Sequence, residues 1–260
     1  MTHNGHEQTV TVMLHRASIT LSLLALAVAG PVVAIAQPAA QSATSTVAPS
    51  LDSSLLDEVN ASRRTLALSA LDTHLGLAGV ASAHARDMAE KGYVGYADTA
   101  GVPLLDQVRI AERQSLIGSF ASNIAVLPAS ATPAQIHAAL LSDPGNAENL
   151  ARGFTHAGMG TYEADGRLYV VQLFARIDGS LSQPLPMKLA GSTLLQPALA
   201  SSGMTTVGWS LVSAEGNLVA RGGGKRIQSS SGQPLEGYLN LDVAVGTDIY
   251  SLRGPYVQVD

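Results

Sequence analysis

An apolar stretch near the N-terminus sets the first boundary in the chain. Residues 17–33 are almost wholly apolar, a short basic segment precedes them, and Ala34-Ile35-Ala36 follow. This order is typical of a cleaved secretory signal peptide. We therefore expect residues 1–36 to be a signal peptide and the mature chain to be extracytoplasmic (periplasmic or secreted), with no stable membrane insertion after cleavage. The alternative is an uncleaved membrane anchor, which Gly30-Pro31 would interrupt, and Met13 is an alternative start.

After the signal segment the apolar spacing becomes that of helices. Residues 37–50 are rich in Pro, Ala, Ser and Thr, so we expect a linker there. Asp52 or Ser53 then caps a predicted helix with an apolar stripe that ends at Leu66 and Leu68. The same spacing predicts further helices over residues 77–91, 104–111 and 133–141.

The remaining pattern is that of strands. Residues 157–163 and 168–175 read as a hairpin closed by Ala164-Asp165-Gly166. A Pro-containing linker over residues 180–186 follows, and beyond it apolar and polar residues alternate without any helical spacing. The sequence therefore predicts an α+β domain over residues 51–179 and a small all-β module over residues 187–260.

The amino-acid composition excludes several classes of partner and of catalytic or metal site. The formal net charge is −5, and no run of Lys or Arg offers the basic face that a nucleic-acid partner requires. The chain has no cysteine, which excludes disulfides, a cysteine zinc site and a thiol nucleophile. Trp209 is interpreted as a core residue of the β module, with carbohydrate stacking as the alternative.

Three stretches of the 51–179 segment resemble the CAP superfamily of cysteine-rich secretory, antigen 5 and pathogenesis-related proteins, especially its bacterial branch. They are L-D-E-V-N-A-S-R-R (residues 56–64), A-S-A-H-A-R-D-M-A-E-K-G (residues 81–92) and F-T-H-A-G-M-G (residues 154–160), the last followed by a second strand. The resemblance implies an α-β-α sandwich and a polar cleft that holds His and Glu side chains.

The sequence departs from the family at that cleft. Tyr96 and Asn146 stand where bacterial members carry His, Ser122 stands where they carry Glu, and Gly153 stands where animal and plant members carry a further His. Phenol, hydroxyl and amide groups are poor zinc ligands and do not exchange protons near neutral pH. We therefore expect no metal site and no cofactor.

Four histidines lie beyond the signal segment: His74, His84, His137 and His156. We expect a structural role for His84, a solvated position for His156 and no particular role for His74. His137 is expected either at the surface or facing the cleft. The candidate ligand-binding residues are therefore Tyr96, Ser122, His137 and Asn146, with no catalytic residue assigned.

The sequence as a whole predicts an exported, non-catalytic CAP-like protein that acts by binding. The expected partner is a small apolar or lipid-like ligand, or a component of the cell envelope. The alternative is a hydrolase with a rebuilt cleft that uses His137, the one candidate whose ordinary pKa lies near neutral pH.

Overall fold

The computed structural model describes residues 50–227 and 234–260. The expected signal peptide, and all of the expected linker except Ser50, lie outside these residues. Helices and strands both contribute to the fold, which confirms the α+β prediction. No helix in the described part of the chain is long and apolar enough to cross a membrane.

Three long antiparallel strands form the centre of the first half of the fold. Strand β4 (Arg167–Leu181) lies between β3 (His156–Ala164) and β2 (Ser115–Pro128). The short β1 (Asp72–Thr73) pairs with β3 in parallel. Asp165 and Gly166, both with positive φ, join β3 to β4 in the two-residue turn that the sequence predicts.

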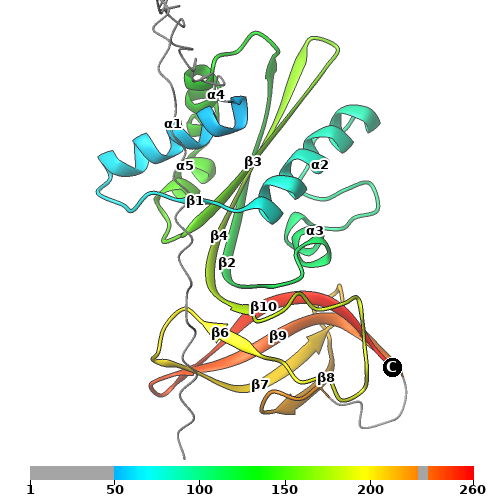
Figure 1. Ribbon diagram of the computed structural model, residues 1–260. Helices are drawn as coiled ribbons and strands as arrows, with labels where there is room; N and C mark the ends of the chain where they lie inside the picture. The colour runs from blue at the N-terminus through cyan, green and yellow to red at the C-terminus, as the bar shows by residue number, and fades with distance from the viewer. Residues whose placement is uncertain (1–49, 228–233) are drawn as a thin grey trace, which may run out of the picture. The chain divides into compact units, whose positions relative to one another are not determined.

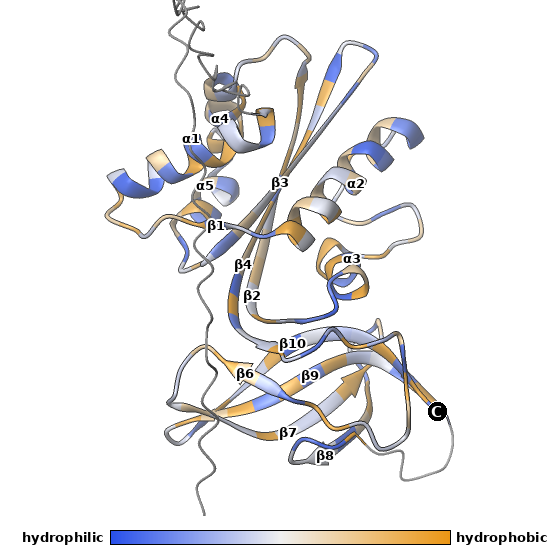
Figure 2. Ribbon diagram, in the orientation of Figure 1, coloured by the Kyte–Doolittle hydropathy of each residue, from blue (hydrophilic) through white to orange (hydrophobic). Residues whose placement is uncertain are grey.

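Helices cover both faces of these strands (Figure 1). Helices α1 (Leu51–Thr65), α4 (Pro133–Leu141) and α5 (Pro144–Ala151) pack on one face, while α2 (Leu75–Lys91) and α3 (Leu104–Ala111) pack on the other. Helix α1 carries both apolar and polar stretches, as expected of a helix with one buried side (Figure 2). This arrangement is the expected α-β-α sandwich.

Two glycines let α2 lie directly on β3. A Cβ atom at Gly158 would overlap the backbone of Leu77 and Ala78, and one at Gly160 would overlap the backbone of Ala81 and Ser82. Both glycines belong to the F-T-H-A-G-M-G stretch. Their role is to allow close packing of the helix on the strand, because glycine has no side chain to keep the two backbones apart.

Some boundaries differ from the prediction. The first helix ends at Thr65 instead of reaching Leu68, because the guanidinium of Arg63 holds the carbonyl of Ser69 and the chain turns there. Leu66, expected in the apolar stripe, is 51% exposed. Strand β2 and helix α5 were not predicted, because β2 alternates only partly between apolar and polar residues and α5 has few apolar ones.

The second half of the described chain is all β, as predicted. Its long strands are β7 (Met204–Val212), β9 (Leu235–Val245) and β10 (Asp248–Val259), with β8 (Leu218–Gly223) at one edge and the short β5 (Lys188–Leu189) and β6 (Pro197–Leu199) beside them. Strand β10 has an irregularity in its pairing with β9 between Arg253 and Tyr256.

The two halves are joined by more than the connecting chain. Arg253 of β10 pairs with Ile117 of β2, so the strands of both halves form one ten-stranded sheet. Ser180 and Leu181 of the expected linker lie at the end of β4. Each half nevertheless has its own hydrophobic clusters, and the division into two domains stays a prediction.

Candidate functional site

The four candidate residues lie on four different elements. Tyr96 is in the loop between α2 and α3, is 53% exposed, and accepts a hydrogen bond from the amide of Leu104 through its backbone carbonyl. Ser122 is on β2, His137 on α4 and Asn146 on α5.

The structure does not gather their side chains into one site. Side chains alternate along β2, and Phe120 and Ile124 pack with α2 and α3, whereas Ala121 and Ala125 pack with α1 and α4. The side chain of Ser122 therefore points to the α2–α3 face. His137 and Asn146 are buried on helices that pack against the opposite face.

His137 has a structural environment. Its Nε2 lies 2.7 Å from the hydroxyl of Ser62 on α1, and the side chain is 7% exposed. Burial lowers the pKa of His137, and the nearby carboxylate of Glu58 opposes that shift. The ring therefore joins α1 to α4 and is neither at the surface nor facing Ser122.

Asn146 belongs to a cluster of amides beneath α5. Asn123 donates to the backbone carbonyl of Asn146 and to the side-chain carbonyl of Gln172, both at 3.3 Å, and Asn149 donates to Asn123 at 3.0 Å. Amides do not titrate in the physiological range. This cluster fixes α5 to β2 and β4 and supplies no acid or base.

The family-like motif residues also hold the fold. Asn60 exchanges hydrogen bonds with the backbone N–H and carbonyl of Leu71, and Arg63 binds backbone carbonyls in the segment before β3. The Nε2 atom of His84 lies 2.7 Å from the backbone carbonyl oxygen of Gly95. These contacts explain the residue types at those positions without invoking catalysis, and agree with the structural role expected for His84.

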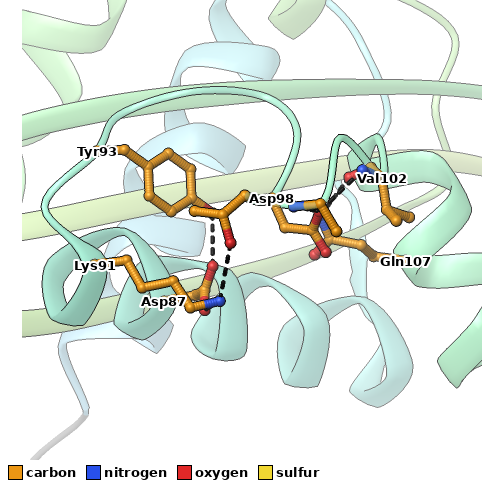
Figure 3. Close-up of polar contacts among 8 residues, drawn as sticks. Asp87, Lys91, Tyr93, Asp98, Val102 and Gln107 are labelled. Carbon is orange, nitrogen blue, oxygen red and sulfur yellow. Dashed lines mark hydrogen bonds and ion pairs between the residues drawn. The ribbon is translucent and has the colours of Figure 1, made fainter.

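A polar cavity of about 300 Å³ lies between α2 and the loop that contains Tyr96. On one side, Asp87 receives hydrogen bonds from Lys91 and from the hydroxyl of Tyr93 (Figure 3). On the other side, the carboxylate of Asp98 accepts hydrogen bonds from the backbone N–H groups of Ala100 and Val102, each at 2.9 Å. The lining also includes His84, Arg86, Glu90 and Gln107.

Two titratable groups at or beside this cavity have shifted pKa values. The hydrogen bond from Lys91, followed by that from Tyr93, lowers the pKa of Asp87. Burial and the bond to Asp87 raise the pKa of Tyr93 above its usual range. Asp87 is thus a carboxylate and Tyr93 a neutral phenol at neutral pH, and the cavity offers hydrogen-bond acceptors.

A larger cavity, of about 460 Å³, contains two histidines to which the sequence assigned no function. His74 caps α2, because its Nδ1 accepts the amide of Leu77 at 3.3 Å. Its Nε2 lies 3.0 Å from the hydroxyl of Ser115, and the ring meets that of His156 edge to face at 5.8 Å. His74 was not predicted to cap a helix, because the predicted helix starts at residue 77, two residues after the observed start at Leu75.

The Ser115–His74 contact is not that of a nucleophile and its base. Since Nδ1 accepts a backbone N–H, a neutral His74 carries its proton on Nε2 and donates it to Ser115. Ser115 in turn donates to the carboxylate of Glu112 at 3.3 Å. Activation of a serine needs the opposite direction, with the hydroxyl donating to an imidazole nitrogen. This chain of hydrogen bonds fixes the start of α2 to the start of β2.

A third cavity, of about 320 Å³, lies at the end of the β9–β10 hairpin and is mostly apolar. Its apolar lining consists of Met204, Val243, Val245, Tyr250 and Leu252. Arg176 and Asp178 of β4, paired at 2.8 Å, complete it. Trp209 is 2% exposed and its indole N–H donates to the backbone carbonyl of Arg226, so it offers no platform for a sugar ring.

In the part of the chain that the structure describes, no group of three or more His, Asp or Glu side chains is arranged to hold a metal ion.

Two solved structures are similar to part of this chain. The chain is similar to an extracellular protein containing an SCP domain from Bacillus anthracis, with 24% identity and a TM-score of 0.43 over 48% of this chain and 40% of that chain. It is also similar to an outer surface protein from Borrelia burgdorferi, with 19% identity and a TM-score of 0.41 over 47% of this chain and 90% of that one. No curated protein matches.

The match to a family covers the α-β-α sandwich. Residues 56–174 match the cysteine-rich secretory protein family, CAP. The matched span contains the helix with Asn60 and Arg63, the helix with His84 and the glycine-containing strand β3. Residues 56–174 of this chain therefore form a domain that belongs to the CAP family.

Proposed function

We propose that this protein is exported and acts by binding a small amphipathic molecule, without catalysis. The proposal rests mainly on the apolar cavity at the β9–β10 hairpin. Five apolar side chains line it, and a charged pair, Arg176 and Asp178, stands at its edge. An apolar chain with a polar head group matches this distribution, and the volume lies at the lower end of the range for ligand sites.

The positions of the cleft residues support binding over hydrolysis. The hydrolase alternative uses His137 in a rebuilt site with Tyr96, Ser122 and Asn146, but the side chains of His137 and Ser122 lie on opposite faces of the sheet. A general base must come within hydrogen-bond reach of the proton it removes. His137 is instead engaged with Ser62, and no observation favours the alternative.

Export is proposed from the N-terminal sequence. The basic, apolar and small-residue order of residues 13–36 is that of a signal peptide. An exported binding protein meets amphipathic molecules of the cell envelope, which is the ligand source that we propose.

The test is a titration of the exported protein with decanoate, decanol and decyltrimethylammonium, followed through the backbone amide NMR signals of Val245 and Leu252, which line the same cavity and are retained in the variants. We expect saturable shifts, and roughly three- to tenfold weaker binding in Met204→Gln, because the variant puts an amide against the apolar chain. Ile249→Ser is the matched control, since Ile249 is 67% exposed on the same hairpin but does not line this cavity.

Equal affinity in Met204→Gln and the unmodified protein would contradict the binding proposal. Turnover of a p-nitrophenyl ester that His137→Gln abolishes would contradict the absence of catalysis.

A further inference from the structure

We propose that the polar cavity beside α2 binds a primary ammonium group carried on an aliphatic chain, such as a lysine side chain or a free diamine. This site is separate from the apolar cavity and goes beyond the function proposed above. The argument rests on the charge of the cavity, on one buried nitrogen without a partner among the described residues, and on an ammonium group already paired with one of the lining carboxylates.

The lining of the cavity carries an excess of negative charge. Asp87, Glu90 and Asp98 contribute three carboxylates, and Arg86 is the single positively charged side chain among the lining residues. Asp98 uses one oxygen, Oδ1, to hold the loop amides. Glu90 is exposed, and its carboxylate has no hydrogen bond or ion pair among the described residues. Acceptors of a cation are therefore available on both sides of the cavity.

A buried nitrogen of His84 needs a hydrogen-bond donor. The carbonyl of Gly95 can only accept, so the Nε2 of a neutral His84 carries the proton and Nδ1 presents a lone pair. His84 is 1% exposed, and its Nδ1 has no partner in the described part of the chain. A buried acceptor without a donor is unfavourable. Because His84 lines the cavity, a ligand that brings N–H donors satisfies this lone pair.

The structure shows which cation this cluster pairs with. The ammonium of Lys91 lies 2.6 Å from Asp87, which lines the cavity, and donates to Thr99 at 3.2 Å (Figure 3). An ammonium group has three donors that point in different directions, and acceptors surround this cavity on several sides. A guanidinium prefers a planar, bidentate carboxylate, and no group of three ligating side chains in the described residues is placed for a metal ion.

The experiment is an NMR titration of the exported protein with 1,5-diaminopentane, and separately with a short peptide containing one lysine. We expect saturable binding and a change in the ¹⁵N shift of His84 Nδ1 as it gains a donor. Glu90→Gln should weaken binding by about two- to fivefold, the range expected for an exposed ion pair. Glu148→Gln is the matched control, because Glu148 is likewise an exposed helical glutamate but lies on α5.

The titrations distinguish a protein ligand from a small-molecule ligand, and some results would contradict the ammonium site. Binding of the peptide alone identifies a protein partner, and binding of the diamine alone identifies a small molecule; both support an ammonium site. Tighter binding of an arginine peptide, equal binding of 1-pentanol, or an unchanged His84 Nδ1 shift overturns it. Decanoate binding at Met204 is measured independently, so a failure here leaves the apolar-cavity proposal standing.

Discussion

At the scale of single residues, Arg63 shows how a buried charge organises the CAP domain. The side chain is 2% exposed. Its guanidinium donates to four backbone carbonyls, those of Ser69, Leu150, Arg152 and Phe154. One residue of α1 therefore fixes both the turn after α1 and the segment from the end of α5 to the start of β3.

Replacement of Arg63 by Ala should strongly destabilise the protein. Several buried carbonyls would lose their donor, and each unsatisfied group costs about 1–3 kcal/mol, so we expect a loss of at least about 3 kcal/mol in the free energy of unfolding. Urea denaturation measures it. Arg64→Ala, at the exposed neighbouring position, should stay within about 0.5 kcal/mol. Similar losses in the two variants would show that Arg63 does not have this role.

At the scale of elements, the start of α2 depends on an uncharged histidine. Nδ1 of His74 can accept the amide of Leu77 only while it is unprotonated. Burial lowers the pKa of His74; the carboxylate of Glu112 opposes this shift, and His156 adds to it. Because the folded pKa is depressed, the stability contributed by His74 is fully present above the ordinary value near 6.5 and is lost as the pH falls through the lower, folded pKa.

Asparagine at position 74 should remove part of this pH dependence. Asn is a good N-cap and does not titrate, so we expect His74→Asn to retain stability at pH 7 to within about 1 kcal/mol and to lose less of it between pH 7 and pH 5. Thermal melts across that range measure the slope. Some dependence of stability on pH should remain in His74→Asn, because the pKa of His137 is also lowered. The control variant His156→Gln should keep most of the pH dependence of the unmodified protein. An unchanged slope in His74→Asn would exclude the cap as its origin.

At the scale of the whole molecule, α3 ties the CAP domain to the β strands that follow it. Arg109 is buried and donates to the carbonyls of Leu239 and Gly254, both at 2.7 Å. Leu116 of β2 belongs to the core of the β module. The clusters on both faces of the sandwich, by contrast, consist of residues that precede Gly179.

A chain that ends at Gly179 should therefore fold, but with lower stability. We expect it to keep its helices and unfold cooperatively, since both sandwich cores are complete. Its melting temperature should be lower than that of the longer protein, because Arg109 and Leu116 lose their partners. Circular dichroism melting of residues 37–179 beside residues 37–260 makes the comparison. A truncated chain without a cooperative transition would show that the two halves form one domain.

Local patterns in the sequence were sufficient for much of the fold. The helix predicted over residues 133–141 is α4, and the hairpin predicted at Ala164-Asp165-Gly166 joins β3 to β4, because helix spacing and turn geometry depend on residues close together in the chain. The resemblance to the CAP family also predicts that Tyr96, Ser122 and Asn146 replace its His and Glu groups, and this stays a prediction.

Only the tertiary structure decided which of these side chains meet. Ser122 and His137 are separated by the sheet because side chains alternate along β2, and the sequence did not predict β2. The contact between His74 and Ser115 joins residues that are far apart in the chain. The Nδ1 lone pair of His84 is left without a donor because Nε2 of the ring is held by the carbonyl of Gly95, a loop residue. The sequence determined the CAP sandwich, whereas the loss of the family's cleft chemistry stays a prediction. Folding determined where cavities and unpaired acceptors lie, because these depend on contacts between distant residues.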